Sequence, residues 1–506
     1  MNYFVGAYLN GKLTGIEKAQ VNRMKLFTDA GWPATCLYTK YNPKIHENVV
    51  KFGLQGRCFT LYDYFQEATD DNIDVHRDWL DFWETVCGFR LEFVDIAPDV
   101  RLFDEQNRYV AYAHFANEDH QQLVYVNYFD QDHQKVKRDI YDSRGFLSQT
   151  KYLKEQQRVQ AEVYFNRNGQ VKMEKTYQEV KGQTVLKRVI LKNFRQRDWF
   201  FDTEEQLQTF FFDTLYTVGD VYFCDKNGYI GQAMANIATD VTVCAVFHST
   251  HARGQEDVLT APLKSSYQVP LSQPEKFDRF IVSTHQQQVD LQARFDQLPP
   301  ISVIPVGYTQ SQKVNLRQKK PHRIIGVARF SPEKQVLHQV QVVARLVTEF
   351  PDVELHLFGF GNQDEEQKLR AYVAEHDLSE HVFFRGFVTD LSAEYTQASL
   401  QMMTSNEEGF SLATLEALSF GVPVISYDIR YGPSELVEDG VNGNLVTRDD
   451  QDLLFWKVRS YLRDPKLQKN YMKNSLRLTK RYTEAAVMAK WQALLTTIKR
   501  GQTVRD

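Results

Sequence analysis

Two glutamates in the C-terminal part of the chain carry the most informative chemical signal. Glu408 and Glu416 lie in the stretch EGFSLATLE with seven residues between them. The glycine after the first glutamate and the apolar spacing that follows predict a helix that starts near Ser411, with Glu416 about a turn and a half inside it. The N–H groups of a helix start suit a diphosphate, and carboxylates accept hydrogen bonds from sugar hydroxyls. A capped amphipathic helix with two solvated acids is the alternative interpretation.

A second group of residues offers positive charge. Arg329 and Lys334 lie in GVARFSPEK, after a predicted apolar strand that ends at Ala328. Cationic groups at the C-terminal end of a parallel strand lie where α/β sheets bind ligands. Arginine and lysine together can neutralise the charge of a departing diphosphate without a metal. A surface ion pair between Arg329 and Glu333 would explain the same residues.

Three other stretches are less specific. In LFGFG, a strand runs into Gly359 and Gly361, which permit a close backbone approach to a nucleotide. In AVFHSTHARG, His248 and His251 follow another predicted strand, and each could equally be a structural histidine. The acidic run TRDDQD (447–452) comes after the last predicted strand and indicates a helix start, not a metal site.

The elements that must position these residues alternate between strand and helix. Near-continuous apolar runs from 322 to about 447 predict a parallel sheet that is buried on both faces. We expect an N-terminal Rossmann-like half over 1–70 and 196–317 and a C-terminal half over 318–485. The sequence therefore predicts an α/β protein with two doubly wound halves facing a cleft, the GT-B architecture. A last helix over 486–506 could pack back on the N-terminal half.

Between the two parts of the N-terminal half, the pattern changes to short runs with a period of two. YVAYAHF, LVYVNYF and the runs after them alternate apolar and polar residues, and DSRG and NRNG separate them as turns. We predict an inserted antiparallel β-meander domain over 71–195.

Composition excludes several classes of protein. The 506 residues have a net charge of −5, which argues against a general nucleic-acid binder. The start MNYFVGAYLNGKLTG has neither a basic nor a long apolar segment, so we expect no signal peptide, and no apolar run is long enough to span a membrane. The five cysteines form no CxxC pair, so we expect reduced, mostly buried thiols.

Together, these motifs resemble the retaining GT-B glycosyltransferases of the glycogen-synthase-like class. The resemblance covers both α/β halves and is best over 322–450. It implies that Arg329 and Lys334 bind the diphosphate of a UDP-sugar donor. It also implies that Glu408 contacts the transferred sugar and that Glu416 contacts the ribose.

The same resemblance extends the expected donor site. Gly15 matches the glycine loop of the N-terminal half, and we favour His248 over His251 as the histidine that reaches the sugar or the acceptor because it comes first after the strand. Ser411 stands where many members have glycine. The remaining residues expected to line the nucleotide-sugar site are Gly359, Phe387, Gly409, Phe410 and Leu412. No metal or other cofactor is expected.

A β-rich insertion in the N-terminal half is shared by two bacterial groups that the chain resembles more closely. One is the GtfA subunit that starts O-glycosylation of serine-rich adhesins. The stretch TGIEKAQVNR carries this resemblance. The other is TarM and TagE, which glycosylate teichoic acid. The stretch ISYDIRYGPSELVEDGVNGNLV carries this second resemblance. This implies a hexosyltransferase that moves N-acetylglucosamine or glucose to Ser or Thr hydroxyls of a serine-rich surface protein.

The alternatives are a poly(glycerol- or ribitol-phosphate) α-glycosyltransferase and a non-catalytic partner subunit with the same fold. The resemblance also implies a GtfB-like partner, or self-association through the meander. We expect a cytoplasmic protein, with attachment to the inner face of the membrane as an option, and no nucleic-acid partner.

Overall fold

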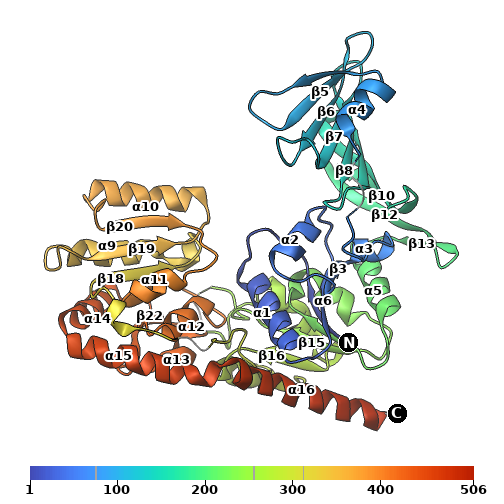
Figure 1. Ribbon diagram of the computed structural model, residues 1–506. Helices are drawn as coiled ribbons and strands as arrows, with labels where there is room; N and C mark the ends of the chain where they lie inside the picture. The colour runs from blue at the N-terminus through green and yellow to red at the C-terminus, as the bar shows by residue number, and fades with distance from the viewer. Residues whose placement is uncertain (74–76, 255–256, 311–312, 506) are drawn as a thin grey trace. The chain divides into compact units, whose positions relative to one another are not determined.

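The computed structural model describes residues 1–73, 77–254, 257–310 and 313–505. It divides into two compact units. Figure 1 colours the chain by residue number, from blue at the N-terminus to red at the C-terminus. The first unit comprises Met1–Met24 and Trp32–Val243, and the second comprises Lys25–Gly31 and Cys244–Asp506. Each unit is described by itself below. The predicted domain ranges also include 74–76, 255–256, 311–312 and 506, which lie outside the described residues.

The Rossmann-like part of the first unit has a parallel sheet in the order β14-β1-β2-β3. Its strands are β1 (Asn2–Gly6), β2 (Ala34–Tyr38), β3 (Cys58–Thr60) and β14 (Val221–Cys224). Its helices are α1 (Gly15–Asp29), α2 (Ile45–Lys51), α3 (Leu61–Phe65), α5 (Glu204–Leu215) and α6 (Asn227–Ala235). The buried Arg23 of α1 pairs with Asp225 behind β14 and lies over the Phe4 ring of β1, which fixes α1 on the sheet.

The insertion is an antiparallel sheet of ten described strands in the order β13 to β4, as predicted. The strands are β4 (Arg90–Phe93), β5 (Asp99–Phe103), β6 (Tyr109–Phe115), β7 (Leu123–Phe129), β8 (Lys135–Tyr141), β9 (Leu147–Lys154), β10 (Arg158–Phe165), β11 (Val171–Val180), β12 (Gln183–Phe194) and β13 (Arg197–Phe201). Gly145 and Gly169 have positive φ in the DSRG and NRNG turns, where glycine carries no steric penalty. A short helix, α4 (Trp79–Asp81), and a π-helical turn, η1 (Phe82–Val86), precede the sheet.

A buried ion-pair cluster joins the meander to the Rossmann-like part of the first unit. Arg144 is 2% exposed and pairs with Asp63 of α3 and with Asp142, each at 2.7 Å. Its guanidinium also donates to the carbonyl oxygen of Ala68 at 2.6 Å. Because each charge is paired and hydrogen-bonded, burial of this arginine does not leave an unsatisfied group.

The second unit begins with strands of the N-terminal α/β region. Three parallel strands lie in the order β17-β16-β15: β15 (Thr242–Val246), β16 (Arg279–Val282) and β17 (Ile301–Val303). The helices between them are α7 (Gln268–Ser272) and α8 (His285–Arg294).

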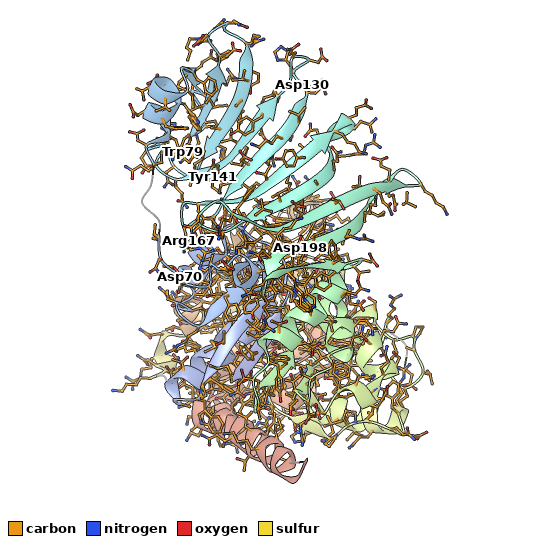
Figure 2. All side chains as sticks on the ribbon, turned by 90° about the vertical axis from the view of Figure 1, so that its right-hand side faces the viewer. Asp70, Trp79, Asp130, Tyr141, Arg167 and Asp198 are labelled. Atoms are coloured by element: carbon orange, nitrogen blue, oxygen red, sulfur yellow. The ribbon has the colours of Figure 1, made fainter. Side chains whose placement is uncertain are left out.

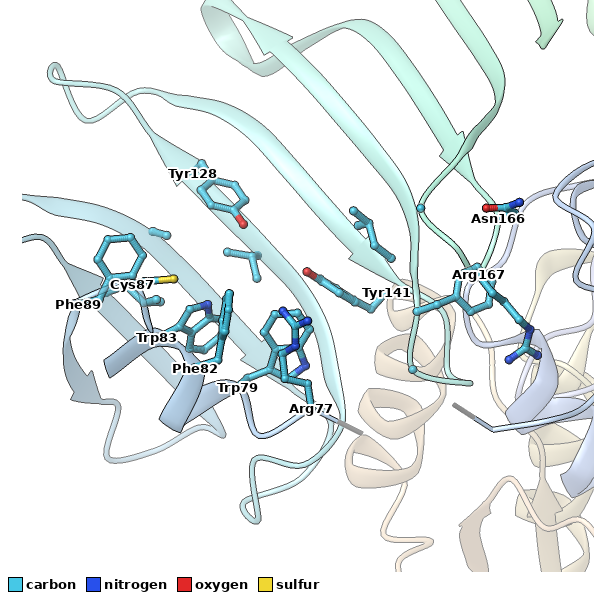
Figure 3. A pocket seen from close by; sticks show the side chains of 17 residues that line it. Arg77, Trp79, Phe82, Trp83, Cys87, Phe89, Tyr128, Tyr141, Asn166 and Arg167 are labelled. Atoms are coloured by element: carbon cyan, nitrogen blue, oxygen red, sulfur yellow. The ribbon is translucent and has the colours of Figure 1, made fainter. Parts of the chain in front are cut away.

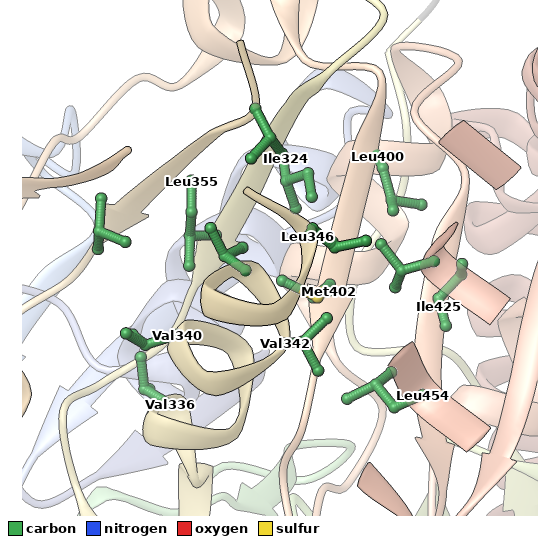
Figure 4. Packing of buried hydrophobic residues seen from close by; sticks show 14 of the residues in the cluster. Ile324, Val336, Val340, Val342, Leu346, Leu355, Leu400, Met402, Ile425 and Leu454 are labelled. Carbon is green, nitrogen blue, oxygen red and sulfur yellow. The ribbon is translucent and has the colours of Figure 1, made fainter. Parts of the chain in front are cut away.

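The C-terminal half has the parallel sheet that the apolar runs predict, with six described strands in the order β20-β19-β18-β21-β22-β23. The strands are β18 (Arg323–Val327), β19 (Glu354–Phe358), β20 (Val382–Gly386), β21 (Leu400–Met403), β22 (Val424–Asp428) and β23 (Gly443–Thr447). Its helices are α9 (Val336–Leu346), α10 (Gln363–Glu375), α11 (Ser392–Gln397), α12 (Leu412–Ser419), α13 (Pro433–Leu436), α14 (Gln451–Arg463) and α15 (Pro465–Leu478). In Figure 4, Val340 and Leu346 of α9 pack with Leu355, Met402 and Ile425 of three strands. This core fixes the strand ends that carry the candidate site.

The end of the chain is helical. Asp450 caps α14 by accepting the N–H of Leu453, so the TRDDQD run is a helix start as predicted. The last helix, α16 (Glu484–Arg505), places Trp491 edge-on to Phe27 with 5.6 Å between ring centroids. None of the helices in the described part of the chain is both long and apolar enough to cross a membrane.

Candidate active site

The residues that the sequence singles out gather where the strands of the C-terminal sheet end. Arg329 and Lys334 follow β18, Gly359 follows β19, Phe387 follows β20 and Glu408 follows β21. Since parallel strands all point the same way, their carboxyl ends share one edge of the sheet. The topology thus explains why motifs that are far apart in the sequence meet there.

The two charged motifs are in direct contact. The Nζ atom of Lys334 lies 2.7 Å from Oε1 of Glu408, and the hydroxyl of Ser405 donates to the same oxygen at 2.8 Å. The two charged side chains are 14% and 19% exposed, so solvent reaches both without screening them fully. The hydroxyl of Thr404 donates to the carbonyl oxygen of Lys334 at 3.0 Å, which ties the two loops together. The pair brings one cation and one carboxylate to the same point.

Arg329 is placed differently. It pairs with Glu333 at 2.8 Å, and its side chain is 55% exposed. Burial alone would raise the pKa of Glu333, but a hydrogen bond from Ser331 and the charges of Arg329 and Lys334 lower it overall. The exposed guanidinium can turn toward an anionic ligand at low cost, because a surface ion pair contributes little.

Contacts of backbone atoms fix the loop that carries Glu408. The N–H of Tyr431 donates to the carbonyl oxygen of Glu408 at 2.9 Å. At the next residue, Gly409, a Cβ atom would lie 2.0 Å from the carbonyl oxygen of His248. Any side chain at 409 would therefore push the two loops apart, so glycine is required by contact with the loop after β15.

Helix α12 begins where the sequence predicts. Ser411 is its N-cap in the left-handed region, with φ 68°, which explains why glycine would also fit there. Its hydroxyl lies 2.8 Å from that of Thr414. Phe410 is buried and packs edge-on against Tyr482. Glu416 lies in the second turn of α12 and is partly exposed.

The two glycines of LFGFG make a close approach inside the protein. A Cβ atom at Gly359 would lie 1.8 Å from the carbonyl oxygen of Ala328, and one at Gly361 would lie 2.2 Å from that of Phe330. Their lack of a side chain thus lets the loops after β18 and β19 touch. Phe387 is 40% exposed and lies edge-on to Phe360, with ring centroids 5.3 Å apart.

The two candidate histidines differ in how deeply they are buried. His251 is fully buried, its Nε2 atom donates to the carbonyl oxygen of Val258 at 3.2 Å, and burial lowers its pKa to about 4. Its Nδ1 atom has no hydrogen-bond partner among the described residues. His248 is half-buried instead. A histidine that meets a ligand must be accessible, and the role of His248 stays a prediction.

The loop that carries His248 is fixed by a residue that the sequence analysis did not identify. The phenol oxygen of Tyr267 accepts hydrogen bonds from the N–H groups of His248 at 2.9 Å and Ser249 at 3.0 Å. The Tyr267 ring is buried and stacks on Phe247 at 4.6 Å. A single tyrosine in SSYQVP carries no motif, so only the fold shows this role.

Two further contacts were not predicted from the sequence. Lys264 pairs with Glu407 at 2.5 Å, beside the Lys334–Glu408 pair. The charged GPSELVEDG segment also has a definite role, since the carboxylate of Glu435 accepts the backbone N–H of His285 at the start of α8. These ion pairs and hydrogen bonds join the loops of α7 and α8 to the C-terminal sheet.

Gly15 belongs to the first unit and begins α1, where a Cβ atom would meet nothing within 4 Å. Its expected part in donor binding stays a prediction.

Within the described ranges, no group of three or more His, Cys, Asp or Glu side chains is placed to hold a metal ion. None of the five cysteines is in a disulfide, and all but Cys87 are buried, as expected.

Comparison with known proteins defines the class. Residues 308–477 match the family Glycosyl transferases group 1. A crystal structure of the pneumococcal O-GlcNAc transferase GtfA, in complex with UDP and GlcNAc, has the same fold, with a TM-score of 0.84 at 20% identity over 98% of each chain. The chain therefore has the predicted GT-B fold, and residues 308–477 carry a Glycosyl transferases group 1 domain.

The similar proteins include a peptide N-acetylglucosaminyltransferase subunit and a poly(ribitol-phosphate) N-acetylglucosaminyltransferase. The GtfA subunit of a UDP-N-acetylglucosamine–peptide N-acetylglucosaminyltransferase from Streptococcus gordonii is 27% identical over 61% of this chain, a match that spans 63% of that protein. A poly(ribitol-phosphate) alpha-N-acetylglucosaminyltransferase from Staphylococcus aureus is 21% identical over 94% of this chain and 96% of its own length. A GtfA/B complex matches with a TM-score of 0.83 at 23% identity over 99% of each chain.

Proposed function

We propose that this chain transfers N-acetylglucosamine or glucose from a UDP-sugar to Ser or Thr hydroxyls of a serine-rich surface protein, with retention of the anomeric configuration. The observation that carries the enzymatic part is the contact between Lys334 and Glu408, because it unites the diphosphate-binding and sugar-binding motifs at one point. A subunit without catalysis would have no need of this pairing together with Arg329 and Glu416.

In the proposed reaction, the bond between the anomeric carbon and the β-phosphate oxygen breaks and a bond from the acceptor oxygen to that carbon forms on the same face. The acceptor's proton passes to the departing β-phosphate, so no separate protein base is required. Arg329 and Lys334 stabilise the negative charge that develops on UDP. Glu408 binds hydroxyls of the transferred sugar, Glu416 binds the ribose, and His248 contacts the sugar or the acceptor.

The remaining donor contacts come from the same edge of the sheet. Backbone N–H groups at the start of α12, from Ser411 and Leu412, suit the diphosphate because a helix start favours negative charge. Gly409 and Phe410 form the turn that leads to it, and Gly359 and Phe387 line the neighbouring strand ends. Gly15, in the glycine loop of the N-terminal half, is also proposed to contact the donor.

The acceptor is assigned from the relatives. The peptide N-acetylglucosaminyltransferase subunit supports a protein acceptor, and the GtfA/B complex supports a partner subunit. A teichoic acid polymer is the second candidate, because the poly(ribitol-phosphate) enzyme aligns with 94% of this chain and with 96% of its own length. A cytoplasmic location is part of the proposal in either case.

UDP release tests the proposal. UDP-N-acetylglucosamine and UDP-glucose are each incubated with a serine-rich peptide or with a poly(ribitol-phosphate) polymer, with and without a co-expressed partner subunit. Turnover on the peptide, with an α-linked product by NMR, supports the protein acceptor. Turnover on the polymer alone assigns the chain to the second candidate. Failure of both donors to bind or turn over in every combination would overturn the enzymatic proposal.

A further inference from the structure

The meander contains a pocket that the donor site does not use. It has a volume of about 650 Å³ and lies entirely within the first unit, between the α4–η1 segment and one face of the sheet. This volume is within the range of small-molecule sites, about 300–1,000 Å³. Figure 2 labels Trp79 and Tyr141, which mark the pocket on the sheet, and Arg167, which lies nearer the Rossmann-like part.

The roof of the pocket is aromatic because of residue spacing. Trp79, Phe82 and Trp83 stand at positions i, i+3 and i+4, which face the same side of a helical turn. The rings of Trp79 and Trp83 are 5.7 Å apart, and the guanidinium of Arg77 lies 4.4 Å from the Phe82 ring centroid. These contacts hold several flat apolar surfaces over the sheet.

The floor is hollow because small and large side chains alternate across the strands. Ala111 of β6 and Val126 of β7 line it, and both are buried. On the same face, Tyr128 of β7 and Tyr141 of β8 reach toward the roof, as Figure 3 shows. The Tyr141 ring lies edge-on to Trp79 at 5.2 Å.

Three polar atoms of the pocket have no hydrogen-bond partner in the described part of the chain. Within the residues that the structure describes, the hydroxyl of Tyr141 and the indole N–H groups of Trp79 and Trp83 make no hydrogen bond. Tyr141 is 8% exposed and Trp83 is 5% exposed. Buried tyrosine and tryptophan side chains usually bind a partner through these atoms. Their position indicates a ligand that is apolar on its faces and polar at its edges.

A hexose ring has this chemistry. Its C–H faces can lie on aromatic rings, and its hydroxyls around the edge can both donate and accept hydrogen bonds. A fully apolar ligand would leave the three polar atoms unsatisfied. No Asp or Glu lines the pocket, so it lacks the carboxylates that mark the donor site.

We propose that this pocket binds a hexose residue of a glycan, as a saccharide site separate from the donor site. The assignment goes beyond the proposed function, since it concerns recognition of a saccharide and not its transfer. It does not depend on which acceptor the enzyme uses. A glycan bound here would be held on the meander by aromatic contacts and by Tyr141.

Direct binding to the full-length chain tests this. Chitotriose and maltotriose are titrated against the protein in the presence of UDP, and binding is followed by calorimetry and by tryptophan fluorescence. We expect millimolar or tighter binding of at least one of them. Trp79→Ala should weaken that binding about tenfold or more, and Tyr141→Phe about fivefold, because a stacking surface or one hydrogen bond is lost.

Two controls separate this site from others. Trp199→Ala alters a tryptophan of the same sheet whose indole already donates to the Phe194 carbonyl, and it should leave saccharide affinity unchanged. Glu408→Ala should also leave it unchanged, while UDP release reports the donor site independently. No binding of either trisaccharide, or binding equally strong in Trp79→Ala and Tyr141→Phe, would overturn the proposal whatever the outcome for transfer.

Discussion

Lys334 and Glu408 are 74 positions apart, yet Nζ of the first lies 2.7 Å from Oε1 of the second. One follows β18 and the other follows β21, and these strands are neighbours in the parallel sheet. The ion pair therefore follows directly from strand order. In the proposed reaction, the cation would stabilise the leaving diphosphate and the carboxylate beside it would bind the sugar.

Replacement of Lys334 tests the first half of this arrangement. We expect Lys334→Ala to lower the rate of UDP release by about 10²–10³-fold, because one preorganised positive group is lost where charge develops. Steady-state kinetics with UDP-N-acetylglucosamine measure this. Lys368→Ala, which breaks an exposed pair with Glu365, is the matched control and should retain full activity. Equal activity in both variants would contradict the role of Lys334.

Tyr267 is expected to act as a positioning residue for His248. In Tyr267→Phe, two backbone N–H groups lose their acceptor, which should lower the free energy of unfolding by about 1–3 kcal/mol and reduce kcat. Urea unfolding and kinetics are measured together. Tyr461→Phe is the control, since its hydroxyl donates to Ser399 in the core. The control should lose stability but not kcat, and a Tyr267 variant that behaves in the same way would exclude a positioning role.

Glycine at 409 is required by the contact with the loop of His248. The added methyl group in Gly409→Ala would meet the His248 carbonyl oxygen, so the loops must separate. A shift of this kind can lower the rate on the order of 10²-fold. A thermal melt confirms folding, and turnover is then compared with the unchanged protein. Full turnover in a folded Gly409→Ala variant would show that the two loops need not touch.

The buried His251 gives stability a pH dependence. Its pKa in the folded protein is about 4, below the ordinary value of 6.5, so the unfolded chain binds more protons between these values. This contribution is complete above about pH 6.5 and is lost as the pH falls toward 4. Urea unfolding from pH 4.5 to 7.5 should show it, and His251→Gln should flatten the curve. An unchanged slope in the variant would contradict this assignment.

Much of the fold follows from periodicity. The alternating runs YVAYAHF and LVYVNYF have the bounds of β6 and β7. The α4–η1 segment was not predicted, because three residues of α-helix and a π-helical turn are too short to show a helical period. That segment forms the roof of the meander pocket.

The candidate site could be predicted only where residues form a local motif. Glu408 and Arg329 stand beside glycines or strand ends that mark a ligand-binding edge. Tyr267 ends a short 3-10 helix (Ser265–Tyr267) more than 130 residues before Glu408, and nothing in its neighbours marks it. The order after a single strand favours His248 over His251, but it does not predict that His248 is half-buried and His251 fully buried.

The most direct test of the proposed chemistry compares two adjacent glutamates. Glu408 pairs with Lys334 and Glu407 pairs with Lys264, so each carboxylate has one lysine partner. UDP release from UDP-N-acetylglucosamine is measured for Glu408→Gln and Glu407→Gln, with donor binding measured in parallel. The account predicts a loss of about 10²-fold or more in Glu408→Gln and a change of only a few-fold in Glu407→Gln. Full activity in Glu408→Gln, or an equal loss in both variants, would contradict it.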